Sequence, residues 1–137
     1  MNILKKECIY LYFDGGSRGN PGPAGCGASI QNKNKEIYKI SKYIGDTTNN
    51  VAEYNALYYG LEIAVENGLT ELIVFGDSLL VINQVNGIWR CKNEKLRIIL
   101  NKINLLKEKF DSIEFKHIRR EKNKRADELA NIAMDCH

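Results

Sequence analysis

The sequence predicts an α/β fold in which a mixed five-stranded sheet is flanked by helices. Two observations predict it. Five short apolar runs have the length and the β-branched or aromatic content of strands, and four other segments repeat apolar residues at helical spacing. The first three strands follow one another directly and the last two alternate with helices, which predicts a mixed sheet. The length corresponds to about one domain, and residues 1–137 are expected to form it.

Three strands are predicted in the first third of the chain. Residues 9–13, 25–31 and 36–43 are short apolar runs bounded by turn residues. A glycine-rich turn joins the first two, and residues 32–35, with the sequence NKNK, provide a hairpin loop between the second and the third.

A helix and a buried strand follow. Residues 52–66 place apolar side chains such as Leu57 and Leu61 on one face, and Gly68 ends this helix. Residues 71–77, with the sequence ELIVFGD, are typical of a strand that is buried on both faces.

The remaining elements are two helices, a strand and a last helix. Residues 78–86 predict a helix that Gly87 ends, and residues 93–110 carry a long apolar stripe typical of an amphipathic helix. Residues 113–118 predict the final strand and residues 125–134 the final helix.

The charge distribution is more informative than the net charge of +3. Residues 116–125, KHIRREKNKR, hold six basic side chains against Glu121 alone. Such a run is either a solvated surface or a phosphate-binding patch. No apolar run approaches the ~20 residues of a membrane-spanning helix, and the N-terminus lacks the apolar core of a signal peptide. A cytoplasmic protein without membrane contact is expected.

The four cysteines, Cys8, Cys26, Cys91 and Cys136, are scattered and form no C-x-x-C pair. With only two histidines in the chain, a structural zinc site is not expected. Free and mostly buried thiols are expected, and a bridge to Cys136 is the alternative.

Four acidic residues stand at the ends of predicted elements: Asp14, Glu53, Asp77 and Asp127 (the four acids). Each has an ordinary structural explanation. Asp14 suits a turn, Asp77 with Ser78 suits a helix cap, and an acid in the first turn of a helix, as expected for Glu53 and Asp127, interacts with the helix dipole.

Taken together, the four acids suggest a metal site. Sites in open sheets form beyond the carboxyl ends of strands, where Asp14 and Asp77 meet if their strands are parallel neighbours. Carboxylates gathered there would repel one another unless a divalent cation lay between them. Oxygen ligands without a His/Cys cluster suit Mg²⁺ or Mn²⁺.

Four blocks of the sequence carry a family resemblance: FDGGSRGNPGPAG at 13–25, TTNNVAEYNAL at 47–57, VFGDS at 74–78 and NKRADELAN at 123–131. They resemble, in order, the four signature blocks of type 1 ribonuclease H. The chain looks like the short archaeal-like and bacterial members that lack the basic protrusion, and the resemblance implies the ribonuclease H-like fold.

The resemblance implies an endonuclease that hydrolyses the RNA strand of RNA–DNA hybrids with two metal ions, Mg²⁺ or Mn²⁺. The four acids match the family's metal-binding catalytic acids. The family's substrate-contacting positions match Gly15, Gly16, Asn20, Thr48, Asn49 and Asn50. Glycines beside Asp14 would let a nucleic-acid backbone approach closely. Capping of the following helix is the alternative role for Asn49 or Asn50.

Two residues compete for an accessory catalytic role. His117 stands ten positions before Asp127, where the best-known bacterial members carry a catalytic histidine. Because no glycine surrounds it, His117 is alternatively a plain sheet residue. Arg120, in an H-x-x-R-E-x-N arrangement that resembles the shorter members, is the competing candidate to contact the scissile phosphate.

The extra basic helix of the bacterial type has no room here, because residues 86–95 lead almost directly into the long helix. Arg90, Lys92, Lys95 and the basic run are the candidate substitutes. Trp89 suits stacking on a sugar or base, but a core position is the favoured interpretation.

Other functions remain open at the level of the sequence. One is a hybrid-binding module without catalysis, and another is a nuclease of the same fold that acts on a different nucleic acid. Double-stranded RNA is a further candidate partner, since its minor groove also presents 2′-OH groups. A monomer is expected.

Overall fold

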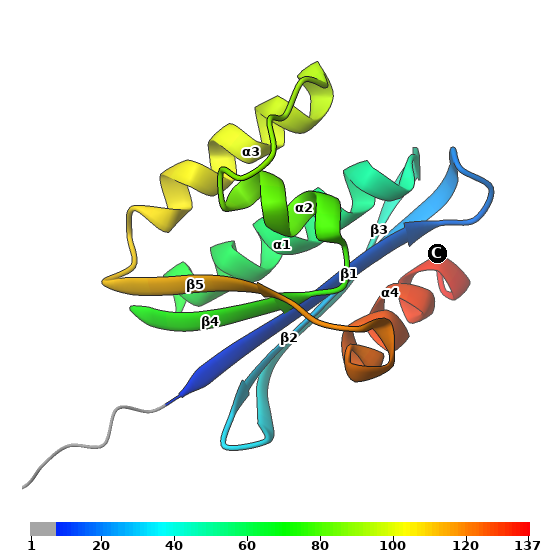
Figure 1. Cartoon of the computed structure of the whole chain (residues 1–137). Helices are drawn as coiled ribbons and strands as arrows, with labels where there is room; N and C mark the ends of the chain where they lie inside the picture. The colour runs from blue at the N-terminus through cyan, green and yellow to red at the C-terminus, as the bar shows by residue number, and fades with distance from the viewer. Residues whose placement is uncertain (1–7) are drawn as a thin grey trace, which may run out of the picture.

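A mixed five-stranded sheet runs through the middle of the computed structural model, which describes residues 8–137, and helices cover both of its faces (Figure 1). The elements in chain order are β1 (Ile9–Ser17), β2 (Gly22–Asn32), β3 (Lys35–Thr47), α1 (Asn49–Glu66), β4 (Glu71–Gly76), α2 (Leu79–Val85), α3 (Glu94–Lys107), β5 (Ser112–His117), the 3₁₀ turn η1 (Arg120–Lys122) and α4 (Lys124–Asp135). The predicted mixed sheet and its order of elements are confirmed.

The strand order β3-β2-β1-β4-β5 explains why the site forms where it does. β1 pairs antiparallel with β2, which pairs antiparallel with β3, whereas β4 lies parallel to both β1 and β5. Phe13 faces Gly76 across the parallel pair, so Asp14 and Asp77 follow at the same end of adjacent strands. The strands that precede the two acids are therefore parallel neighbours, which is the condition under which the acids were expected to meet.

The core lies mainly between the sheet and α1. Leu11 and Phe13 of β1 are fully buried, and Leu11 packs against α1 at Gly60, where an added Cβ would lie 2.9 Å from the leucine Cδ1. Each large apolar side chain buried in this way contributes roughly 1.5–3 kcal/mol of transfer free energy. α3 packs on α1, and α4 covers β1, β2 and β3 on the opposite face (Figure 1). The sheet is thereby held rigidly between two helical layers.

The strands extend further than predicted at the end that carries the site. β1 continues to Ser17 and β3 to Thr47, because their glycine-containing ends pair with β2 across the predicted turn region. The β2–β3 hairpin lies where it was expected, with Lys33 and Asn34 at φ values of 52° and 64°. Positive φ at both turn residues matches the type I′ geometry that two-residue hairpins favour.

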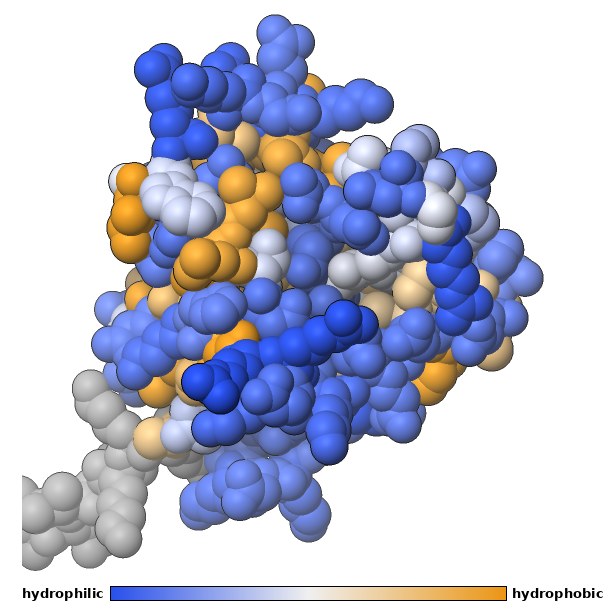
Figure 2. All heavy atoms as spheres, turned by 45° about the vertical axis from the view of Figure 1, so that its right-hand side comes forward, coloured by the Kyte–Doolittle hydropathy of each residue, from blue (hydrophilic) through white to orange (hydrophobic). Residues whose placement is uncertain are grey.

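Trp89 does not belong to the core, so the favoured sequence-based interpretation is wrong. Its side chain is 45% exposed and that of Ile88 is 68% exposed, because residues 86–93 cross the surface between α2 and α3 without forming a helix. Figure 2 shows apolar side chains reaching the surface in the upper part of the view, amid hydrophilic neighbours. The absence of an extra basic helix between α2 and α3 is as predicted.

The cysteines also differ in part from expectation. All four are free, as predicted, and no bridge to Cys136 is formed. Only Cys26 and Cys91 are buried, whereas Cys8 and Cys136 are exposed, because Cys8 precedes the first strand and Cys136 follows the last helix. Within residues 8–137, no helix has the length and apolar character needed to cross a membrane.

Candidate active site

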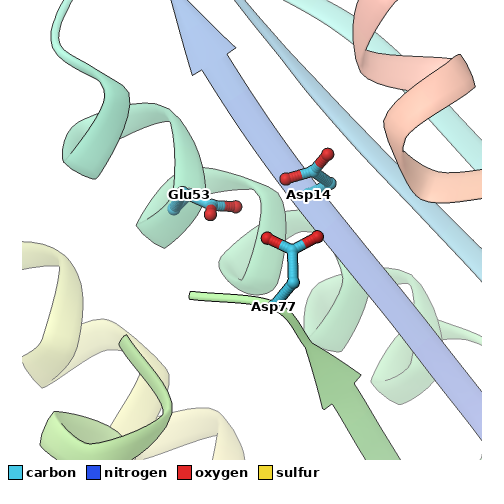
Figure 3. Close-up of side chains that lie close together, drawn as sticks. All are labelled: Asp14, Glu53 and Asp77. Carbon is cyan, nitrogen blue, oxygen red and sulfur yellow. The ribbon is translucent and has the colours of Figure 1, made fainter. Parts of the chain in front are cut away.

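Three of the four acids form a tight cluster at the carboxyl end of the sheet (Figure 3). One carboxylate oxygen each of Asp14, Glu53 and Asp77 lies within 4.8 Å of the other two. They come from β1, from α1 and from the residue that follows β4. Asp14 and Glu53 are each 8% exposed, which is unusual for acids that have no cationic partner.

The close packing of α1 on β1 brings Glu53 to the cluster. A Cβ added at Gly15 would lie 2.3 Å from the main-chain carbon of Ala52, so only glycine allows this approach. The Gly15 N–H then donates to Glu53 Oε1 at 2.7 Å and also to Asp14 Oδ1 at 3.0 Å. The backbone that approaches Gly15 is therefore that of α1. A Cβ placed at Gly16 would instead be in ordinary van der Waals contact, with the nearest atoms at 3.9 Å.

The start of α1 differs from the prediction. Thr48, and neither Asn49 nor Asn50, caps the helix, since its hydroxyl accepts a hydrogen bond from the Val51 N–H at 3.2 Å. The helix thus begins three residues earlier than expected, and Glu53 lies beyond its first turn. Because the helix dipole acts within the first turn, it explains the presence of an acid at Glu53 less well than the sequence suggested.

The electrostatics of the cluster oppose full ionisation. Burial, and secondly the negative charge of Asp77, raise the pKa of Asp14 to about 7. Burial and then the charge of Asp14 raise the pKa of Glu53 well above its ordinary value. A divalent cation would remove this penalty, and an all-carboxylate donor set is the kind that Mg²⁺ and Mn²⁺ prefer. The residues present therefore fit such an ion.

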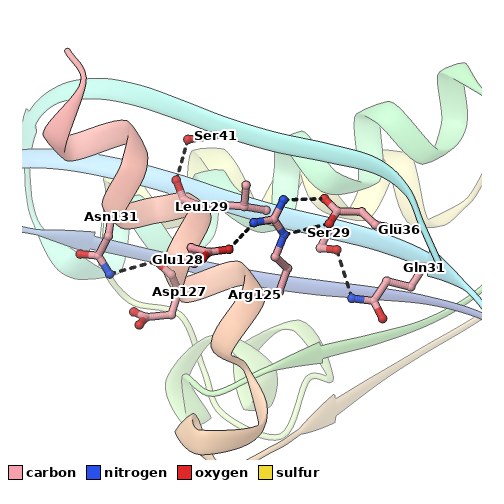
Figure 4. Close-up of polar contacts among 9 residues, drawn as sticks. All are labelled: Ser29, Gln31, Glu36, Ser41, Arg125, Asp127, Glu128, Leu129 and Asn131. Carbon is pink, nitrogen blue, oxygen red and sulfur yellow. Dashed lines mark hydrogen bonds and ion pairs between the residues drawn. The ribbon is translucent and has the colours of Figure 1, made fainter. Parts of the chain in front are cut away.

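Asp127 lines the same cavity as the other three acids, which has a volume of about 420 Å³. It lies in the first turn of α4, as predicted, and its side chain raises the pKa of Asp14, although the main causes are burial and Asp77. The Asn131 amide donates to the Asp127 carbonyl at 3.0 Å and so stays beside it on the helix (Figure 4). All four acids line this one cavity, together with Arg120.

Three of the six predicted substrate-contacting residues line the cavity next to the acids. Gly15, Gly16 and Asn49 line the cavity. Asn49 Oδ1 accepts hydrogen bonds from the Ser17 N–H at 2.8 Å and the Ser17 hydroxyl at 3.2 Å. Asn20 Oδ1 accepts from the Asn49 N–H at 3.0 Å. The two amides therefore hold the end of β1 against the start of α1. Thr48 is occupied as the cap, and Asn50 is exposed in the first turn.

The two accessory candidates are placed differently. Arg120 is the first residue of η1, and it is exposed and lines the cavity with the acids. His117 ends β5, and its Nε2 lies 3.2 Å from the main-chain oxygen of Asp77, outside the residues that line the cavity. His117 is thus a strand residue in this structure, as its alternative interpretation proposed.

The basic run is mostly exposed, with one exception. Arg125 ion-pairs with Glu36 of β3 and with Glu128 of α4, with 2.8 Å between its Nε and Glu36 Oε2 (Figure 4). It therefore ties α4 to β3, while the neighbouring Lys122 and Lys124 point their charge to solvent. Arg125 therefore has a structural role that the sequence did not predict, and the exposed basic members fit either predicted role, a solvated surface or a phosphate-binding patch.

Sequence reasoning assigned no role to Asn123, which precedes α4. It is 1% exposed, and its amide nitrogen donates to the Phe13 carbonyl at 2.8 Å and to Asp77 Oδ2 at 2.9 Å. The signals were its place in the H-x-x-R-E-x-N arrangement and at the start of the block at 123–131. They were missed because an asparagine before a helix is ordinarily a cap. In the structure its side chain makes no capping bond.

Comparison with known proteins points to one family. The reverse transcriptase-like family model matches residues 12–133. The chain is 40% identical to ribonuclease HI of Halobacterium salinarum over 93% of its own length and 64% of that protein. It is 44% identical to a bifunctional protein of Mycobacterium tuberculosis, of which it spans only 36%.

Solved structures agree with this assignment. The N-terminal RNase H domain of the Mycobacterium tuberculosis protein matches with a TM-score of 0.90 and 42% identity, covering 93% of this chain and 98% of that one. LC11-RNase H1, solved in complex with an RNA/DNA hybrid, matches with a TM-score of 0.88 and 44% identity, covering 93% and 96%. With the acid cluster in place at the carboxyl end of the sheet, the chain belongs to the type 1 ribonuclease H family.

Proposed function

We propose that this protein hydrolyses the RNA strand of RNA–DNA hybrids, with the four acids holding two Mg²⁺ or Mn²⁺ ions. The observation that carries the proposal is the cluster of Asp14, Glu53 and Asp77 within 4.8 Å, with Asp127 on the same cavity. Ions bound there would supply an activated water and stabilise the leaving oxygen of a phosphodiester. The specific activity rests also on similarity to proteins named ribonuclease H.

The chain's own contribution is to hold buried carboxylates in a fixed arrangement. Asp14 lies between the other acids, since Gly15 ties it to Glu53 and its pKa responds to both Asp77 and Asp127. The Gly15 N–H fixes Glu53 Oε1 and leaves the second oxygen of that carboxylate for an ion. Preorganised charge in a partly dry site is worth more than the same charge in water.

The cavity wall formed by Gly16 and Asn49, with Asn20 hydrogen-bonded behind Asn49, suits the substrate backbone. Gly16 lines the cavity and has no side chain, so a sugar-phosphate chain can pass close to the main chain. Asn49 and Asn20 are held by their amide oxygens, which orients the amide nitrogens without further ordering. Such donors suit 2′-OH groups and phosphate oxygens, the features by which RNA is distinguished from DNA. The relative solved with a bound RNA/DNA hybrid supports this substrate class.

Arg120 is the better candidate for the accessory role. It reaches the cavity, and a guanidinium binds a phosphate through two parallel hydrogen bonds. His117 stays on the strand beside the main chain of Asp77. Cleavage of double-stranded RNA, a monomeric state and a cytoplasmic location stay predictions.

The deciding assay incubates the protein with an end-labelled RNA–DNA hybrid in Mg²⁺, in Mn²⁺ and in excess chelator. Parallel reactions contain double-stranded RNA or a DNA duplex with one embedded ribonucleotide. We expect cleavage of the RNA strand of the hybrid only with a metal ion, and loss of at least about 10²-fold in Asp77→Asn, as for removal of a preorganised transition-state group. Cutting that persists in chelator would overturn the metal assignment, and hybrid binding without cleavage would indicate a silent binding module.

A further inference from the structure

Asn123 is the buried polar side chain that joins three parts of the acid cluster. Its two amide hydrogens go to the Phe13 carbonyl, immediately before Asp14, and to the carboxylate of Asp77. The main-chain carbonyl of Asn123 accepts a hydrogen bond from the Asp127 N–H at 3.1 Å and so starts the turn of α4 that carries this acid. Because both side-chain neighbours are acceptors, only one orientation of the amide satisfies them.

Asn123 is a polar residue in a fully buried position. Asn123 Oδ1 is buried and has no hydrogen-bond partner among the described residues. An unsatisfied buried acceptor costs about 1–3 kcal/mol. A residue that only filled the space between β1 and α4 would be more stable if it were apolar. The amide therefore fits a function of its two N–H donors better than a packing role.

Asp77 is the acid most in need of such a donor. It follows the end of β4, it is only half-buried, and Ser78 rather than Asp77 caps α2. Repulsion from Asp14 favours rotation of its carboxylate towards water. The Asn123 amide, 2.9 Å from Oδ2, opposes that rotation and does not engage Oδ1.

From these contacts we infer that Asn123 is a positioning residue. It holds Asp77 in a cation-binding orientation and fixes the start of α4 against the end of β1 at the site. The inference rests on the proposed function, since it concerns the same cluster. It assigns no contact between Asn123 and the substrate or an ion. The residue acts through Asp77 and through the main chain beside Asp14 and Asp127.

The test compares Asn123→Ala with Asn86→Ala. Asn86 is a matched control, because its amide also donates to a strand carbonyl, that of Phe115 at 3.0 Å, but it touches none of the acids. Mg²⁺ and Mn²⁺ affinities are measured by titration calorimetry without substrate, at a temperature at which circular dichroism shows each variant folded. Urea unfolding in chelator gives the stability of each variant separately.

We expect Asn123→Ala to lower metal affinity by about 10-fold or more, as outer-shell substitutions do, while Asn86→Ala changes it less than about 2-fold. Asn123→Asp keeps the shape but loses the donors, so its affinity should not recover. In the Asp77→Ala background, Asn123→Ala should have little further effect, because coupled residues are not additive. If the wild type binds metal and Asn123→Ala binds it equally well, this inference is overturned while the proposed function stands. If the wild type neither binds metal nor cuts the hybrid, the proposed function fails as well.

Discussion

At the residue scale, the site depends on carboxyl groups held where water cannot fully solvate them. Asp14 and Glu53 are each 8% exposed and lie next to one another and to Asp77. Burial is the first cause of their raised pKa values, and the charges of neighbouring acids add to it. Protons and divalent cations therefore compete for the same carboxylates.

The first prediction concerns pH. The folded-state pKa of Asp14, about 7, lies above its unfolded value of 3.8, so the folded protein holds more protons between these values. Without metal, stability from this group is greatest below pH 4 and is lost as pH rises through about 7. Mg²⁺ should stabilise the protein more at pH 8 than at pH 6. Chemical denaturation with and without Mg²⁺ at both pH values measures this, and an equal Mg²⁺ effect at both would contradict it.

The second prediction concerns the glycine beside Asp14. Gly15→Ala places a Cβ within 2.3 Å of the α1 main chain, which must move. We expect a loss of about 1–3 kcal/mol or more in unfolding free energy, since overpacking against backbone is not relieved by a rotamer change. Gly16→Ala, whose Cβ has 3.9 Å of clearance, is the control and should stay within about 0.5 kcal/mol. Equal urea midpoints for the two variants would refute the packing role of Gly15.

At the scale of elements, the paired ends of β1 and β4 and the start of α1 determine which side chains meet. Sequence periodicity predicted these elements well, but their ends less well. Thr48 was not predicted as the cap, because three consecutive residues, Thr48, Asn49 and Asn50, are all of types that cap helices. Only the geometry of the chain leaving β3 selects Thr48.

The third prediction separates the cap from substrate binding. Thr48→Ala removes the hydroxyl that accepts from the Val51 N–H and should lower the unfolding free energy by about 1 kcal/mol. Thr48→Ser keeps an acceptor and should restore most of it. If Thr48 acts only as a cap, the KM for the hybrid stays unchanged in both variants. A KM that is raised in Thr48→Ala, under conditions in which this variant is folded, and restored in Thr48→Ser would instead indicate a substrate contact of the hydroxyl.

At the scale of the whole molecule, Arg120 of the acid cavity belongs to a basic run, although the net charge is only +3. Lys122 and Lys124 are exposed next to Arg120, whereas Arg125 is engaged with Glu36 and Glu128. A polyanion that enters the cavity would meet Arg120 next to the acids. The exposed members of the basic run are therefore the ones expected to contact phosphates.

The fourth prediction concerns salt dependence. Lys122→Ala should reduce the slope of log affinity for the hybrid against log salt by about 0.7–0.9, the effect of losing one phosphate contact. Lys109→Ala, an exposed lysine that follows α3, is the control and should leave the slope unchanged. Binding is measured with an Asp77→Asn background to prevent cleavage. Equal slopes in both lysine variants would show that the basic run is only solvated surface.

The sequence alone determined the class of fold, the order of its elements and the identity of the four acids, because periodicity and short motifs are local properties of the chain. It also predicted that no extra basic helix lies between α2 and α3. It misplaced Trp89, since the burial of a single aromatic side chain depends on which surface the connection crosses. It gave Asn123 no role, because this amide acts on Phe13 and Asp77, which are distant in sequence.

Tertiary structure alone decided which side chains share the cavity. The parallel register of β1 and β4 brought Asp14 beside Asp77, and the glycine contact with α1 brought Glu53 to both. The same packing placed Arg120 on the cavity and left His117 on its strand. Spacing along a chain cannot fix these relations, because they arise from how helices and strands distant in sequence pack against one another.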